Sequence, residues 1–238
     1  MKLLAGIALS VSVLVGENQV LRPEAFLNQG NIIQYESNSK MQGGEAARTS
    51  IALEIIAVSQ KNGRTNAKGK LTFFSAIGLE NMVSLVQFAS DSIKFCANTT
   101  NWFYIPKARM RGTTESYSGD SLVYPFSMRV GDSLPDGHAS RSFRSDSFTS
   151  TEKMIIHHRF VADFDSLELK FRKISAFRIE SILSAESVAS FEDGSDKKSK
   201  SSYILVEWFS PVYGLVKSEC RYSNGYSISE MSNPSVKK

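Results

Sequence analysis

The chain is poor in the residues that build most catalytic and metal centres. Its 238 residues include only two cysteines and three histidines. It contains no Cys-x-x-Cys pair, no His-Glu-x-x-His motif and no glycine-rich phosphate loop. These motifs are the local signatures of zinc sites, metalloproteases and nucleotide-binding domains. The sequence therefore predicts neither a metal site nor a cofactor.

A strong charge of one sign is also missing. The 28 lysines and arginines are interleaved with 24 acidic residues, which leaves a net charge of +4. Proteins that bind nucleic acid concentrate positive charge on one face, so we expect no nucleic-acid partner. The basic cluster Lys107 to Gly112 is predicted to be a solvated loop, and the alternative is an anionic contact surface led by Arg109 and Arg111.

Long hydrophobic runs are missing after the first residues. The segment from Leu3 to Val15 carries no charge, but it is too short to span about 30 Å of hydrocarbon as a helix. Small residues at Ser12 and Gly16 offer cleavage points. We predict a signal peptide over residues 1–16 and one exported domain over residues 17–238. A buried first element and an uncleaved anchor are the alternatives, and an integral membrane protein is not expected.

Export would affect the redox state of the two cysteines. Cys96 and Cys220 would meet an oxidising compartment, where they could pair. Both lie in apolar, strand-like runs, and a buried reduced cysteine is ordinary in such a run. The sequence leaves both states open.

The sequence does contain regular alternation of apolar and polar residues from residue 30 onward, which predicts antiparallel strands. A short helix over Pro23–Gln29 is the one helical candidate, and Ser175–Ser190 fits either a strand or a helix. The polar segment Glu192–Ser202 is predicted to be a mobile hairpin loop. Turns are expected at Asn62-Gly63, between Pro211 and Gly214, and at Asn224-Gly225. The candidate strands are Asn31–Ser37, Ser50–Gln60, Gly69–Gly78, Glu80–Ser90, Ser92–Asn98, Asn101–Pro106, Lys153–Phe164, Ser166–Ile174, Ser202–Pro211, Gly214–Tyr222 and Tyr226–Met231.

The strand Lys153–Phe164 contains two of the three histidines. Strict alternation places Ile156, His158 and Phe160 on one face and His157 with Arg159 on the other. The adjacent histidines then point apart, so they are not expected to chelate one ion together. One of them should face the core and the other the solvent.

The letters Gly-Asp-Ser-Leu occur twice, at Gly119–Leu122 and at Gly131–Leu134, and they match the nucleophile block of an esterase family. Such an esterase needs its serine on a tight turn between a strand and a helix, with a histidine to take the proton. Here Pro135 follows at once and starts a turn, and in that family the histidine comes late, whereas none follows His158. We therefore predict no catalytic residue and no enzyme, with a GDSL-type esterase as the last alternative.

Two segments resemble blocks of one known family. These segments are YPFSMRVGDSLPDG (Tyr124–Gly137) and EWFSPVYGLVKSE (Glu207–Glu219). The chain resembles an exported, TapB-like family of uncharacterised Gram-negative envelope proteins. The resemblance implies a fold similar to LolA and LolB, which is a strongly curved antiparallel sheet forming an unclosed barrel. It also implies that both blocks are architectural, with turns made by Gly131, Asp132, Pro135 and Gly137 and by Pro211 and Gly214.

These observations together predict a mainly β, up-and-down meander that holds a ligand. A sheet that curls on itself often lines a groove with aromatic residues. We predict a non-enzymatic binding protein, periplasmic or outer-membrane-associated, with a lipid-like or acylated ligand on its concave face. The groove candidates are Phe74, Phe88, Phe95, Phe160, Phe164, Phe171 and Trp208.

The alternative is an interaction module of an envelope assembly, which binds a protein partner and no small ligand. The two hypotheses differ in what fills the sheet. A groove open to solvent favours the carrier. A barrel filled by its own side chains, with an exposed edge strand, favours the interaction module.

Overall fold

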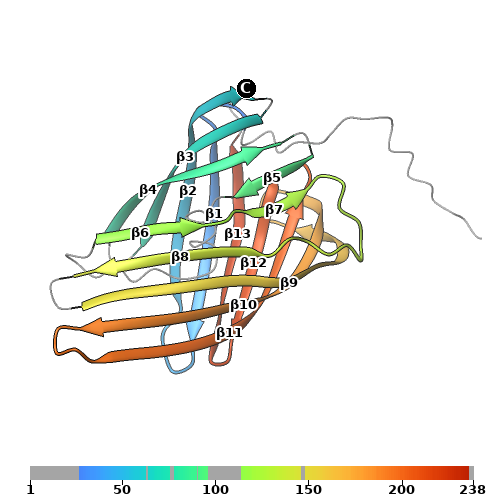
Figure 1. Ribbon diagram of the computed structural model, residues 1–238. Helices are drawn as coiled ribbons and strands as arrows, with labels where there is room; N and C mark the ends of the chain where they lie inside the picture. The colour runs from blue at the N-terminus through green and yellow to red at the C-terminus, as the bar shows by residue number, and fades with distance from the viewer. Residues whose placement is uncertain are drawn as a thin grey trace, which may run out of the picture.

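The computed structural model describes residues 27–62, 64–75, 78–89, 91–95, 114–145 and 148–235. Within these residues every regular element is a β-strand, and the thirteen strands form one antiparallel sheet (Figure 1). The strands are β1 (Ile32–Met41), β2 (Ala47–Lys61), β3 (Arg64–Ser75), β4 (Gly78–Phe88), β5 (Ser92–Phe95), β6 (Thr114–Gly119), β7 (Leu122–Pro125), β8 (Gly137–Arg144), β9 (Phe148–Glu168), β10 (Lys173–Phe191), β11 (Asp196–Ser210), β12 (Gly214–Tyr222) and β13 (Gly225–Ser235). The predicted β fold is therefore confirmed.

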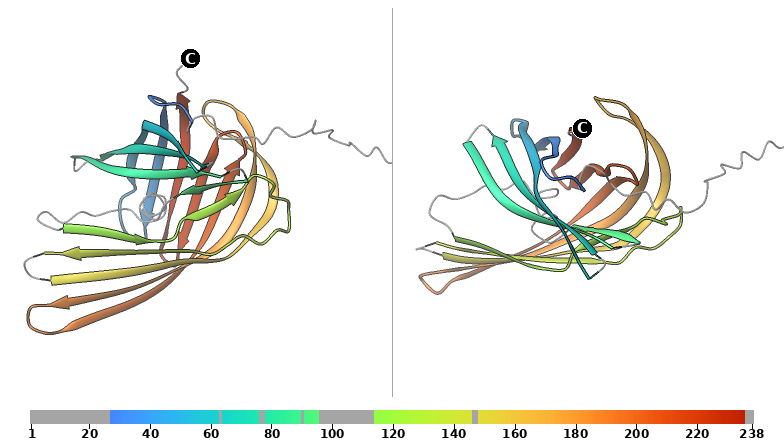
Figure 2. Two further views of the ribbon diagram at one scale, coloured as in Figure 1. Left: turned by 45° about the horizontal axis from the view of Figure 1, so that its top comes forward. Right: turned by 90° about the horizontal axis from the view of Figure 1, so that it is seen from above.

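The sheet is an unclosed half-barrel in which the strand order follows the chain almost throughout (Figure 2). The order is β6-β8-β9-β10-β11-β12-β13-β1-β2-β3-β4-β5-β7, so β13 joins the C-terminal meander to the N-terminal one. The two end strands, β6 and β7, are consecutive in the chain and are separated by Asp120 and Ser121 alone. The chain thus leaves one end of the sheet and at once joins the other.

Two glycines allow close approaches at the ends of the sheet, Gly119 against the neighbouring strand β8 and Gly137 against β7 from the other end. Gly119 has a φ of 132°, and a Cβ there would lie 2.4 Å from the carbonyl oxygen of His138. A Cβ on Gly137 would lie 2.4 Å from Cδ2 of Leu122. Only glycine fits where a backbone or side chain comes this close.

The inner face of the sheet carries one continuous core. Tyr124 of β7 stacks on Phe209 of β11, with ring centroids 4.8 Å apart, although these strands are far apart in the sheet order. The face that they share is therefore the inside of the curve. Tyr35, Phe88 and Leu183 belong to the same buried cluster, and burial of each such side chain contributes about 1.5–3 kcal/mol.

Most expected strands are confirmed, but the boundaries between residues 166 and 202 differ. The predicted strand Ser166–Ile174 is wrong, because β9 ends at Glu168 and a turn follows, closed by Leu169 N–H donating to Arg172 O at 3.0 Å. The alternation of apolar residues there resembles that of a strand because two residues of the turn contact the core: Leu169 is buried and Phe171 packs on it.

The polar segment Glu192–Ser202 is largely strand, because β11 begins at Asp196. The hairpin loop is therefore limited to Glu192–Ser195. The predicted loop is wrong from Asp196 to Ser202, since a backbone ladder forms there without burial of side chains. Cross-strand polar pairs support it: Lys200 Nζ lies 2.5 Å from Glu186 Oε1. Ser175–Ser190 is part of strand β10 and is not a helix.

Some expected features lie outside the described residues. These are residues 1–16, most of the helix candidate Pro23–Gln29, the strand Asn101–Pro106, the basic cluster Lys107–Gly112, and Cys96. Cys220 is a buried free thiol. No helix long and apolar enough to cross a membrane occurs among the residues that the structure describes.

Replacing Gly119 by alanine should destabilise the fold strongly. The new Cβ would strike the backbone of β8 at a φ that alanine disfavours, so we expect a loss of about 3 kcal/mol or more in unfolding free energy. Gly194→Ala is the matched control, because Gly194 also has a positive φ but nothing within 4 Å, and strain alone costs about 1–2 kcal/mol. Urea unfolding measures both, and equal losses would contradict the close approach.

Cys220 should resist alkylation in the folded protein. Burial raises the pKa of its thiol to about 12, so the reactive thiolate is nearly absent at pH 8. In a Cys96→Ser background we expect iodoacetamide to label Cys220 only when urea unfolds the chain. Between pH 9 and 12 the unfolded chain alone loses this proton, so the thiol should make stability fall as pH rises. Rapid labelling of the native protein at pH 8 would contradict this.

Candidate functional site

A strap, residues 126–136, connects the two ends of the sheet. Phe126 N–H donates to Asp91 O at 2.8 Å, beside β5. Further along, Gly131 N–H donates to Val161 O at 2.8 Å and Leu134 N–H donates to Arg159 O at 2.9 Å, both on β9. The strap therefore spans the gap that the backbone ladder leaves open.

The Gly-Asp-Ser-Leu letters belong to this connection. Gly131 has a φ of 94°, and Asp132 Oδ2 accepts a hydrogen bond from Arg129 N–H at 2.8 Å, as predicted for a turn. Ser133 forms an isolated β-bridge with Phe160. The other copy, at residues 119–122, is the junction between β6 and β7. Both copies thus lie where the ends of the sheet are joined, and neither lies between a strand and a helix in the described residues.

Strand β9 contains a bulge where the strap meets it. Two residues of β9, His158 and Arg159, lie opposite the single residue Ser181 of β10. His158 has a φ of 53°, a left-handed conformation that is uncommon for a non-glycine residue. A bulge of this kind shifts the side chains that follow to the other face.

The predicted alternation of Lys153–Phe164 is therefore wrong from His158 to Ala162, and a second register shift, opposite Arg178 and Ile179, restores it at Asp163 and Phe164. Ile156 is followed on the inner face by Arg159 and Val161, and all three are buried. The predicted opposite directions of the two histidines are also wrong, since their ring centroids lie 4.7 Å apart and neither ring is buried. Among the described residues no group of three or more potential ligands could hold a metal ion.

The bulge carries Arg159 into the core, where its side chain is fully buried. Its Nη1 donates to Pro135 O at 2.8 Å and to Val123 O at 3.2 Å. Its Nη2 lies 3.5 Å from Oε2 of Glu207, which is also fully buried. The guanidinium carbon lies 4.9 Å from the ring centroid of Tyr124. One side chain thus contacts β7, the strap and β11.

Glu207 has a second buried partner. The hydroxyl of Tyr124 donates to Glu207 Oε1, and the ring of Tyr124 meets Phe95 edge-on at 5.6 Å between centroids. We call Tyr124, Arg159 and Glu207 the buried triad. Tyr124 lies in the first resembling block and Glu207 in the second, so the fold brings the two blocks into contact at this point.

Sequence reasoning missed the buried triad. Strict alternation assigned Arg159 to the face of β9 that does not contain Ile156. The local sequence contains no pattern that predicts the bulge. Glu207 did carry a signal, because a lone carboxylate between Val206 and Trp208 in an apolar strand requires a buried partner.

The seven groove candidates do not share one surface. Phe88 and Phe95 belong to the inner core, and Phe171 packs partly against Tyr213. Trp208 is buried on the opposite face from Glu207. Three candidates are exposed by 42 to 49%: Phe74, Phe160 and Phe164.

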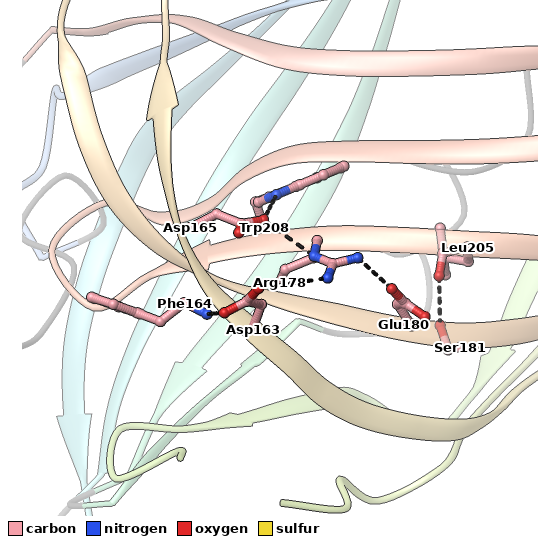
Figure 3. A network of polar contacts seen from close by, with 8 residues as sticks. All are labelled: Asp163, Phe164, Asp165, Arg178, Glu180, Ser181, Leu205 and Trp208. Atoms are coloured by element: carbon pink, nitrogen blue, oxygen red, sulfur yellow. Dashed lines mark hydrogen bonds and ion pairs between the residues drawn. The ribbon is translucent and has the colours of Figure 1, made fainter. Parts of the chain in front are cut away.

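A polar network surrounds Trp208 where β9 and β10 curl (Figure 3). Its Nε1 donates to Asp165 Oδ2 at 3.1 Å. Arg178 Nε lies 3.2 Å from the same carboxylate oxygen, and Arg178 also pairs with Asp163 and Glu180. Trp208 is therefore held in place by the protein itself and is not available as a groove wall.

The outer face of β9, β10 and β11 exposes apolar side chains instead. Ile182 lies directly opposite Ile204 in the ladder, and Ile155 and Phe160 lie on the same face of β9. Their exposed fractions are 36% for Ile182, 56% for Ile204, 40% for Ile155 and 42% for Phe160. We call these four residues the outer-face patch. Exposed apolar clusters rimmed by polar residues are typical of interaction surfaces.

Comparison with known proteins supports the fold. No family model and no curated protein matches the chain. A candidate exported protein of Bacteroides fragilis with a YmcC-like fold has a TM-score of 0.65 at 14% identity, over 92% of this chain and 99% of that one. A candidate lipoprotein of Parabacteroides distasonis has a TM-score of 0.65 at 10% identity, over 88% and 97%. The chain shares a curved-sheet fold with both.

The buried pair should show strong coupling in a double-mutant cycle. Arg159→Met or Glu207→Gln alone strands a buried polar partner and should cost about 3–5 kcal/mol. The double variant should lose clearly less than the sum of the two. The same cycle on the exposed pair Glu186 and Lys200 is the control and should show almost no coupling. Urea unfolding measures both cycles, and additive losses at Arg159 and Glu207 would show that the pair is not coupled.

Proposed function

We propose that the chain is an exported, non-enzymatic protein of a bacterial cell envelope that acts as an interaction module. The observation that supports this proposal is the division between the two faces of the sheet. The inner face is packed with the protein's own side chains, including the buried triad, whereas the outer face exposes the outer-face patch. A filled interior is what the interaction hypothesis requires.

The envelope location has two supports. The apolar, uncharged segment Leu3–Val15 has the pattern of a signal peptide. The two solved proteins that share the fold are described as a candidate exported protein and a candidate lipoprotein. Periplasmic or outer-membrane-associated residence is part of the proposal.

The sheet also offers an edge for strand addition. Strand β8 pairs with β9 only as far as Ile156, and the strap bonds to β9 at Arg159 and Val161. Beyond that point, in the described part of the chain, β9 pairs with β10 alone up to Glu168. A partner strand could hydrogen-bond to this free edge.

A lipid carrier remains the second candidate. Its support is an exposed aromatic pair at the curl of the β9–β10 hairpin, where the rings of Phe164 and Phe177 lie 4.7 Å apart. Phe164 is 49% exposed. Such a pair could hold an acyl chain at the rim of the sheet rather than inside it.

One purification from a bacterial envelope separates the two functions. Native mass spectrometry with lipid extraction should find the chain without acyl species. A photo-crosslinking phenylalanine analogue at position 204 should give a discrete protein adduct in the envelope, because Ile204 is the most exposed residue of the outer-face patch. The same analogue at position 212 is the control, since Val212 is exposed but lies at the β11–β12 turn.

The opposite result would favour the carrier. A near-stoichiometric acyl species that is lost in a folded Phe164→Asp variant, together with no adduct from position 204, would overturn the interaction module.

A further inference from the structure

We propose that a second copy of this chain covers the outer-face patch, in a two-fold symmetric dimer whose sheets pack face to face. This proposal rests on the proposed function, because it names the partner of the outer face. The argument depends on the order of charged and apolar residues along three neighbouring strands.

The ladder arranges the outward side chains of β9, β10 and β11 in five rows. The central row holds His157, Ile182 and Ile204. The rows on either side hold the other two members of the patch, Ile155 and Phe160. Listed from one end to the other, the rows are Lys153–Glu186–Lys200, Ile155–Ser184–Ser202, His157–Ile182–Ile204, Phe160–Glu180–Val206 and Asp163–Arg178–Trp208.

On β9 and β10 the apolar residues lie in the three middle rows, together with the charged Glu180, and full charges occupy both end rows. On β11 one end row holds Lys200 and the other holds the buried Trp208. On β9 the end residues are Lys153 and Asp163, and on β10 they are Glu186 and Arg178. Each strand therefore carries opposite charges at its two ends. The two strands carry them in opposite order.

Consider a two-fold axis that lies between the two sheets and runs perpendicular to the strands along the central row. This axis brings the opposite charges of the two copies together. It places each strand over its own copy and reverses the rows. Lys153 then faces Asp163 of the second copy, and Glu186 faces Arg178 of the second copy. Ile182 and Ile204 face their own counterparts. Opposite charges meet at both ends on β9 and β10, and apolar groups meet in the centre, which is the pattern of a specific interface.

The other simple two-fold arrangement is disfavoured by the same charges. An axis parallel to the strands keeps the rows and exchanges β9 with β11. Lys153 would then face Lys200, while Glu186 and Arg178 would each face their own copies. Glu180 would also face its own copy, so like charges would meet at every charged position on these strands except Asp163, and such contacts oppose association.

The surface has a suitable shape. Strands β9 to β11 span all five rows and, at about 4.8 Å spacing and about 3.3 Å per residue from Lys153 to Asp163, outline about 480 Å² on each copy. Strand β8 extends this surface only as far as Ile156, and β12 extends it only from Ile204 onward. Seen from above, β8 to β11 form a nearly flat layer before β9 and β10 curl (Figure 2, right). A flat layer allows two sheets to pack.

A distance test uses the residues that face their own copies. In a Cys96→Ser background, Ile182→Cys should be linked into a covalent dimer by a bis-maleimide of about 10 Å span, the usual separation of packed sheets. Val212→Cys is the control, because Val212 is 41% exposed but lies outside the patch, and it should stay monomeric. Comparable linking of both variants, or of neither, would overturn the arrangement.

A charge test examines the ends of the interface by sedimentation equilibrium of the full mature chain. Lys153→Asp should weaken the dimer at least tenfold, and adding Asp163→Lys should restore it. Lys153 and Asp163 are ten positions apart on one extended strand, so they oppose each other only between copies. Ile204→Arg should weaken the dimer at least a hundredfold and Val212→Arg should not, with circular dichroism showing that each variant is folded.

The outcomes separate this inference from the proposed function. A wild-type chain that is monomeric at tens of micromolar, or a charge exchange that fails to restore the dimer, would overturn the dimer. If position 204 then crosslinks to a different envelope protein, the proposed function as an interaction module is supported although the dimer is not. A monomer that carries an acyl species and gives no protein adduct contradicts both.

Discussion

Arg159 keeps a full charge inside the core, and the rest of the sheet is arranged around it. A buried guanidinium is tolerated only where it is paired and hydrogen-bonded. Here its partners come from β7, the strap and β11, which are brought together only when the sheet curves. The bulge in β9 and the left-handed backbone of His158 follow from this requirement, because they turn Arg159 inward. The curvature and the ion pair therefore depend on each other.

The sequence predicted those features that depend on residues close together in the chain. Asn62 has the positive φ that its turn required, at 52°, and the last three strands form the expected meander. Prediction failed for features that are determined by contacts with residues distant in the chain. The bulge at His158 allows Arg159 to contact the strap and Glu207. Neither partner lies near His158 in the chain. Asp196–Ser202 extends as a strand because β10 offers a ladder, which composition alone does not reveal.

The same distinction applies to the candidate site. The aromatic residues were predicted to line a groove, but residue type does not say which face of the sheet they occupy. Phe88 and Phe95 fill the interior and Trp208 is held by Asp165, whereas the outer-face patch is exposed. Of the outer-face patch only Phe160 was among the predicted groove residues, and Ile155, Ile182 and Ile204 are ordinary strand residues without a motif. They become a surface only through the register of three strands.

The position of β1 between β2 and β13 has a consequence for how the chain acquires its structure. Ser37 and Ser229 contact each other across 192 positions of sequence, so this part of the ladder has very high contact order, and topologies of this kind fold slowly. The N-terminal meander must keep an open hydrogen-bonding edge until the last strand has been made. A chain that cannot complete its sheet early stays unfolded for longer, which would suit the proposed export, because translocation through a narrow channel requires an unfolded chain.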